Sequence, residues 1–202
     1  MSAAGKACTG FSKPYVAKYS IDGGAVTYSG VMLLARGVSV SLSLNTTDDN
    51  TFYADNISAE TAAAVFADGT ATLTVDGLLT AAEKFVLGLP EATEIQASGG
   101  AVQVSHYGDG MEIPYVGIGF VVRYQSGGVV TYAPVVLTKA RFQQPGLDAA
   151  TQEESIDWQT QELTATLMRD DTTNHDWKLV GADQPTEAAA EAVLKAILGG
   201  AA

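Results

Sequence analysis

The side chains that could perform catalysis or bind a metal are few and scattered along the chain. His106 and His175 are the only histidines, and neither stands at metal-ligand or catalytic spacing from another ligand. The single cysteine, Cys8, has no histidine near it in the sequence, so the features that activate a thiol are missing. One cysteine also excludes an internal disulfide, which is typical of proteins of a reducing cytoplasm.

Carboxylates are more numerous, and one group of them falls in a polar stretch. Asp48, Asp49 and Asp55 could supply oxygen ligands to calcium, or a carboxylate pair to a hydrolase. The stretch lacks the alternating ligand positions and the closing glutamate of a calcium loop, which favours a solvated turn. Gly108-Asp109-Gly110 and Gly117-Ile118-Gly119 have no helix N-terminus after them, so neither indicates a phosphate site. We therefore expect no enzyme, no metal and no cofactor.

Composition and charge narrow the function classes further. A chain of 202 residues with 47% hydrophobic residues and no shift of composition predicts a single domain over 1–202. The 23 acidic and 11 basic residues give a net charge of −12, which repels phosphate backbones and excludes a conventional nucleic-acid binder. The chain starts without the apolar stretch of a secretory signal and has no apolar run of membrane-spanning length, so we expect neither export nor membrane binding.

The elements that must position any site are predicted mainly as strands. Residues 38–44 alternate strictly, which places one set of side chains on a core face and the other set on a wet face. The apolar set is Val38, Val40, Leu42 and Leu44, and the polar set is Ser39, Ser41 and Ser43. The polar residues 45–50 predict a reversal of the chain, after which residues 51–57 return as a second strand.

Similar patterns predict most of the remaining chain. Strands are expected over 13–20, 25–31, 70–75, 101–107, 116–124, 129–142, about 154–168 and 176–180. Glycine pairs at 23–24 and 127–128 predict tight hairpin turns, and the hairpin of 116–142 is the longest. The alanine-rich residues 59–67 leave a strand and a helical turn both open.

Two helices interrupt this pattern. Thr80 with Glu83 reads as a capping box, and Gly88 supplies a stop, so a short helix is expected between them. Apolar residues at helical spacing from Ala190 to Leu198 predict a C-terminal helix laid on the sheets. The expected fold is mainly β: an antiparallel β-sandwich or barrel-like subunit with a long hairpin, one short helix and a C-terminal helix.

The order of several short motifs resembles the major tail tube proteins of long-tailed, siphovirus-type bacteriophages. The motifs are Phe52-Tyr53-Ala54-Asp55-Asn56, a threonine-rich strand, a short helix ending at Gly88, and Pro114-Tyr115-Val116-Gly117-Ile118-Gly119-Phe120. Later motifs keep the same order: residues 136–145 resemble that family's strand ending in Phe-x-x-Pro, residues 151–160 its Glu-x-Ile-x-Phe-Gln-Thr segment, and Asp176-Trp177-Lys178 precedes the last helix. The likeness covers nearly the whole chain.

The resemblance implies a structural virion protein that forms hexameric rings, which stack into a hollow tail tube for DNA ejection. Its partners would be itself, the tape-measure protein and the tail tip and terminator proteins, with DNA as a transient, non-specific passenger. The protein would be made in the bacterial host cytoplasm and reside in the virion tail. Ser39, Ser41 and Ser43 become candidates for a lumen wall of net negative charge, and Phe52, Tyr53, Asp55 and Asn56 candidates for contacts between subunits.

Two other functions compete with this reading. The first is a monomeric β-sandwich binding module of a phage tail, which would present Tyr107, Trp158 or Trp177 to a carbohydrate or a protein. Exposed aromatic residues in one patch favour that module, whereas burial of the tryptophans under the helices favours the tube. The second is a hydrolase with a carboxylate pair such as Asp48 and Asp55, although no recognisable sequence motif places such a pair.

Overall fold

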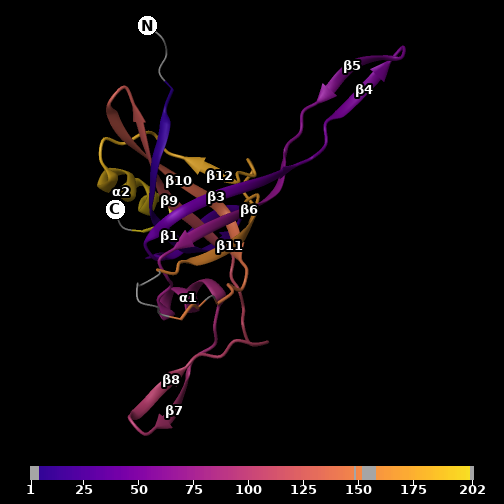
Figure 1. Cartoon of the computed structure of the whole chain (residues 1–202). Coiled ribbons are helices and arrows are strands. Elements are labelled where there is room, and N and C mark those ends of the chain that lie inside the picture. The colour runs from indigo at the N-terminus through magenta and orange to yellow at the C-terminus, as the bar shows by residue number, and fades with distance from the viewer. Residues whose placement is uncertain (1–4, 148, 152–157, 201–202) are drawn as a thin grey trace.

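The computed structural model describes residues 5–147, 149–151 and 158–200, and it is built mainly from antiparallel strands (Figure 1). One eight-stranded sheet contains, in spatial order, β2 (Ala25–Leu33), β1 (Ala7–Asp22), β9 (Val116–Ser126), β10 (Val129–Phe142), β11 (Gln161–Met168), β6 (Phe66–Val75) and β3 (Gly37–Thr46), and β12 (Lys178–Val180) pairs with β10. The helices are α1 (Thr80–Leu87) and α2 (Glu187–Ile197). The predicted fold class is confirmed.

The sheet curls around the larger of two apolar cores. Where the chain passes from β2 to β3, the Leu34 N–H donates to the Pro14 carbonyl at 2.8 Å, and Gly37 of β3 lies against the ring of Phe11 in β1. The inner face contributes the fully buried Leu73, Ile118, Leu137, Leu163 and Leu167. Burying each such side chain stabilises the fold by roughly 1.5–3 kcal/mol. Helix α1 joins this core through Ala82, Val86 and Leu87.

Helix α2 covers the outer face of the sheet over β1, β9 and β10. Leu194 and Leu198 pack with Val121 and Val136 in a second, smaller core. A Cβ atom on Gly119 would lie 2.5 Å from Leu194 Cδ1, so only glycine lets the helix approach this closely. Gly119 in the middle of β9 therefore serves the close packing of α2 on the sheet.

Two hairpins project from opposite ends of this body (Figure 1). Beyond Thr46 and before Phe66 the chain of β3 and β6 extends into β4 (Asn50–Ala54) and β5 (Ile57–Ala62), which pair only with each other; we call residues 47–65 the β4–β5 arm. β7 (Thr93–Ala97) and β8 (Gly100–Val104) likewise form a two-stranded sheet, the β7–β8 arm, residues 93–104. Isolated hairpins of this kind are marginal in water.

The predicted reversal at residues 45–50 is wrong. The chain continues outward there and turns at Asp55 and Asn56, whose φ angles are 51° and 63°. Asp and Asn adopt this left-handed region more readily than other non-glycine residues, so they form the tight turn. The polar stretch instead ties the base of the arm: Asp49 accepts a hydrogen bond from the Ala64 N–H at 2.7 Å, and Thr47 bonds to Val65. As a result, β3 pairs with β6, the strand that returns from the arm, and not with the next strand in the sequence.

Three further expectations are corrected. Helix α1 begins after Leu79 without a side-chain cap, so Thr80 and Glu83 form no capping box; Gly88 ends it as predicted, at φ 60°. The strand expected from about 154 starts only at Gln161: residues 158–160 belong to no strand, and 154–157 lie outside the described residues. Strand β7 was not predicted, and residues 59–67 resolve as strand at both ends, without a helical turn.

The helices of the described chain are short. The longer, α2, has 11 residues, and no described helix is long and apolar enough to cross a membrane.

Candidate functional site

The half of the outer sheet face that α2 leaves uncovered carries a regular array of hydroxyl groups. Strand register places Ser39, Ser41 and Ser43 opposite Thr74, Thr72 and Thr70 of β6, and the next strand, β11, adds Thr164 and Thr166. Ser39 Oγ donates to Thr74 Oγ1 at 3.0 Å, and all three serines are exposed. We call these eight residues the hydroxyl face.

The hydroxyl face arises because three adjacent strands repeat Ser or Thr at every second position. Alternation sends these side chains outward and sends Val40, Leu42 and Leu73 toward the core. Hydroxyl groups bind water and carry no charge, so these eight side chains form a hydrated, uncharged surface. Three charged side chains stand at its margin: Glu162, opposite Thr74, Arg141, opposite Thr166, and Asp68, opposite Asn45. The net negative charge expected of a lumen wall stays a prediction, because this face itself is nearly neutral.

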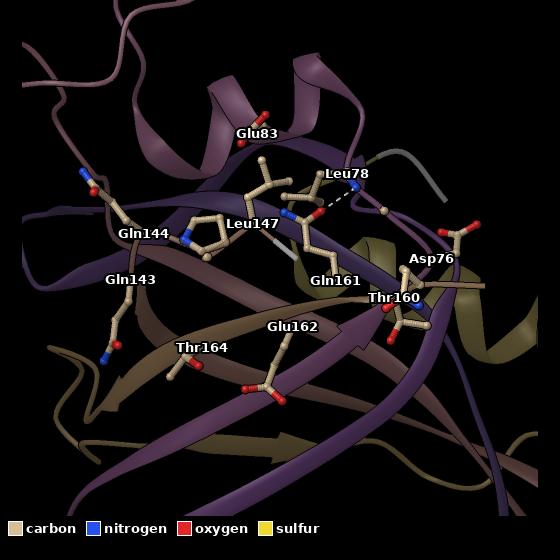
Figure 2. Close-up of a pocket in the computed structure, with 14 residues that line it drawn as sticks. Asp76, Leu78, Glu83, Gln143, Gln144, Leu147, Thr160, Gln161, Glu162 and Thr164 are labelled. Carbon is tan, nitrogen blue, oxygen red and sulfur yellow. Dashed lines mark hydrogen bonds between the residues drawn. The ribbon is translucent and has the colours of Figure 1, made fainter. Parts of the chain in front are cut away.

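A polar groove of about 500 Å³ adjoins the hydroxyl face beside α1. Figure 2 shows Leu147 and Gln161 in its middle, Glu83 on the α1 side, and Glu162 with Thr164 on the β11 side. Gln161 accepts a hydrogen bond from the Leu78 N–H at 2.9 Å, which fixes the start of β11 against the entry to α1. The lining is dominated by amides and carboxylates, namely Gln143, Gln144, Gln159, Gln161, Asp76, Glu83 and Glu162.

The chemistry open to this groove is hydrogen bonding. The Arg36 guanidinium beside Asp76 lowers the pKa of that carboxyl, which keeps it ionised. No group of three or more metal-ligating side chains is placed to hold an ion among the described residues. Trp158, next to the groove-lining Gln159, is 83% exposed.

The predicted subunit-contact residues all lie on the β4–β5 arm. Phe52 and Tyr53 are each 65% exposed, and Asp55 and Asn56 form the turn at its tip. The β7–β8 arm, which sequence reasoning missed, is similar: Ile95 faces Val102 across the hairpin, and both are about half exposed. The sequence signal that could have revealed this arm is the alternation of polar and apolar residues over 93–97.

The two histidines each have a structural partner in the fold. His106 shares a hydrogen bond with Thr93 Oγ1 at 2.6 Å, and His175 contacts the Asp170 carbonyl at 3.3 Å. Asp48 and Asp55 are exposed on the arm and line no part of the groove beside α1. Cys8 is exposed on β1.

The three aromatic residues proposed for ligand binding differ in environment. Trp177 stacks on Phe66 at 4.7 Å between ring centroids and 10° between planes, so it is half-buried against the base of the arm and not under a helix. Tyr107 is exposed, as is Trp158. Neither tryptophan is buried under a helix, which is the arrangement that the tube was expected to show.

The edges of the main sheet are unprotected by charge. β2 and β3 are its terminal strands, and neither contains a charged residue or a proline over its 9 and 10 residues. Monomeric proteins commonly block such edges with lysine, proline or a bulge near the centre of the strand.

Comparison with known proteins does not assign the chain to a family: no protein-family model matches the chain, and no curated protein matches it significantly.

Proposed function

We propose that this protein is a structural subunit that polymerises, as stacked hexameric rings, into the tail tube of a siphovirus-type bacteriophage. The observation that carries the proposal is the pair of projecting two-stranded arms with exposed apolar side chains. Two strands alone bury too little surface to be stable, so the arms become ordered and protected where they contact other copies.

The uncharged edges of β2 and β3 support lateral association within a ring. Each edge presents free backbone donors and acceptors over a long, apolar-to-neutral strand, which is a template for pairing with a further strand. Pairing the β3 edge of one copy with the β2 edge of the next is heterologous, and such a contact closes into a ring when the rotation fits. Ring closure then removes both edges of the main sheet.

The hydroxyl face suits the wall of a conduit for DNA. Ser39, Ser41 and Ser43 are small, neutral and hydrated, and they offer no cationic group to a phosphate. DNA would therefore pass without being held. The acidity of the chain, −12 per copy, adds repulsion from nearby surfaces over roughly 8–10 Å at physiological salt.

Negative-stain microscopy and sedimentation velocity of the purified full chain over a wide concentration range test the proposal. Rings or tubes of uniform width are expected above a critical concentration. Because tail assembly is commonly initiated by other components, the same measurement with added tape-measure and tail-tip proteins belongs to the experiment. A chain that stays monomeric with and without these partners contradicts the proposal.

A second function, a carbohydrate-binding module, is favoured by one observation: the exposed Trp158 directly precedes Gln159, which lines a groove rich in amides and carboxylates. Sugar recognition combines an aromatic platform with such hydrogen-bonding groups. Screening the chain against immobilised glycans, with Trp158→Ala as the matched variant, separates the two. Binding that Trp158→Ala abolishes, in a chain that stays monomeric, supports the module and not the tube.

A further inference from the structure

The charges of this chain are segregated along its sequence, and the β4–β5 arm is purely acidic. Residues 37–122 contain eleven acidic residues and a single basic one, Lys84, whereas residues 1–36 contain four basic residues and one acidic residue. The arm carries Asp48, Asp49, Asp55 and Glu60 and has no lysine, arginine or histidine. A surface that receives it must therefore tolerate or attract negative charge.

The arm also presents aromatic side chains with its carboxylates. Phe52 and Tyr53 occupy neighbouring positions of β4, on either side of a register shift in the hairpin, and both are mostly exposed. Glu60 pairs with Phe52 across the two strands, so an aromatic ring and a carboxylate share one face. A complementary site combines an apolar pocket with a cation at its rim.

A pocket of about 400 Å³ at α1 has this composition. Phe85 and the buried Leu89 form its apolar part, and Lys18 and Lys84 stand beside them; we call it the lysine pocket. Lys18 Nζ lies 5.3 Å from the centre of the Phe85 ring and has no carboxylate within ion-pair distance among the described residues. Lys84 contacts Glu91, a residue 91% exposed, and Glu112 also lines the pocket.

The pocket and the arm lie at opposite ends of the molecule. In Figure 1 the β4–β5 arm extends from one end of the sheet, and α1 lies beyond the other end. An arm cannot reach the pocket of its own chain in this arrangement. Copies that follow one another along the long direction bring the arm of one toward the α1 end of the next, a head-to-tail contact that repeats without limit.

We infer that the lysine pocket of one copy is the docking site for the acidic, aromatic β4–β5 arm of the next copy along the polymer. The inference rests on the proposed function, since it names the contact between successive rings. Phe52 or Tyr53 packs against Phe85 and Leu89, and the arm carboxylates face Lys18 and Lys84. Charge complementarity sets the position of the arm in the pocket, and burial of the aromatic side chain supplies the affinity.

Carbodiimide coupling tests the contact directly, because it joins a lysine to a carboxylate only where the two touch. Assemblies are formed from an equal mixture of ¹⁵N-labelled and unlabelled chains, coupled, digested and analysed by mass spectrometry. Mixed-isotope links from Lys18 or Lys84 to Asp48, Asp55 or Glu60 are expected. Arm carboxylates that link only to other lysines overturn the inference, while assembly itself upholds the proposed function.

Charge reversal gives an independent measurement. Lys18→Glu with Lys84→Glu is expected to raise the critical concentration for polymer growth by about tenfold or more, because like charges then meet. Adding Asp48→Lys and Glu60→Lys in the same chain is expected to restore it to within about threefold. Lys178→Glu is the matched control and leaves the critical concentration unchanged, because Lys178 is exposed and has no carboxylate partner among the described residues.

The outcomes separate the two proposals. Rings without stacks from the lysine-reversed chain, and stacks again from the fourfold variant, support the docking site. Stacks from the lysine-reversed chain, with thermal unfolding equal to wild type, overturn it and leave the tube standing. A wild-type chain that forms no assembly at any concentration, with or without tail partners, overturns both.

Discussion

The carboxylate of Glu191 on α2 accepts a hydrogen bond from the Tyr15 hydroxyl of β1 at 2.6 Å. The same carboxylate contacts Lys195 at 2.9 Å and Lys13 at 3.2 Å, so one side chain ties the last helix to the first strand. The Tyr15 hydrogen bond is the largest cause that lowers the pKa of Glu191, to about 2, and the two lysines lower it further. This one group therefore ties α2 to β1 in addition to the packing of Leu194 and Leu198 on the sheet.

Acid is expected to weaken this attachment. Because the folded-state pKa of Glu191 lies below its ordinary value of 4.5, the ionised group stabilises the fold fully above pH 4.5 and loses its contribution as pH falls toward 2. The melting temperature of wild type should drop over that window more than that of Glu191→Gln. Glu60→Gln, which removes a charge on the arm, is the control. Equal drops for wild type and Glu191→Gln contradict the assignment.

Replacing Gly88 by alanine should destabilise the body strongly. Gly88 has φ 60°, a left-handed conformation, and a Cβ there would overlap the backbone carbonyl of Glu112. Conformational strain and overlap together cost on the order of 2–4 kcal/mol. Gly99→Ala is the control, because a Cβ at Gly99 meets nothing within 4 Å. Urea unfolding measures both, and similar midpoints for the two variants would disprove the prediction.

The β7–β8 arm should matter for assembly and not for folding. Ile95→Ser with Val102→Ser changes two side chains that are about half exposed, so the free energy of unfolding should move by no more than about 0.5 kcal/mol each. Leu73→Ala in the core should lower it by about 2–5 kcal/mol. Sedimentation velocity is expected to show that the arm variant assembles poorly although it melts like wild type. Normal assembly would remove the β7–β8 arm from the interface.

A cation placed on the hydroxyl face should make an assembled tube retain DNA. Ser41→Arg puts one guanidinium per copy in the centre of a neutral array, whereas Gln125→Arg puts the same charge at the distal end of the β9–β10 hairpin. DNA retention by Ser41→Arg tubes should fall steeply with salt, because phosphate contacts release counterions. Fluorescence anisotropy with a labelled duplex checks this. Equal retention by the two variants would argue against a lumen at the hydroxyl face.

The regular elements could be predicted because each obeys a local rule. The alternation around Val121 and Val136, the glycine turns and the spacing of Leu194 and Leu198 are properties of short segments, and the structure confirms them. Which strands become neighbours is not local. Nothing in residues 38–44 says that β3 pairs with β6 and not with the strand that follows it.

The arms show where sequence reasoning failed and why. A polar stretch such as 45–50 usually reverses a chain because its side chains bond to the backbone; here they bond to the returning strand, Asp49 to Ala64, and hold two strands together. The hydroxyl face was half predicted. Its serines follow from one strand, but the threonines of β6 and β11 join them only through the three-dimensional register.

Because the β4–β5 arm prolongs β3 and β6, its length can be altered without disturbing the body. An antiparallel strand rises about 3.4 Å per residue and repeats its faces every two residues. Deleting two residues from β4 and their two partners from β5 would thus shorten the arm by about 7 Å and keep each remaining side chain on its own face. The length of the hairpin would then set the spacing between successive layers of a polymer, and that spacing could be changed by deleting or inserting residues in pairs.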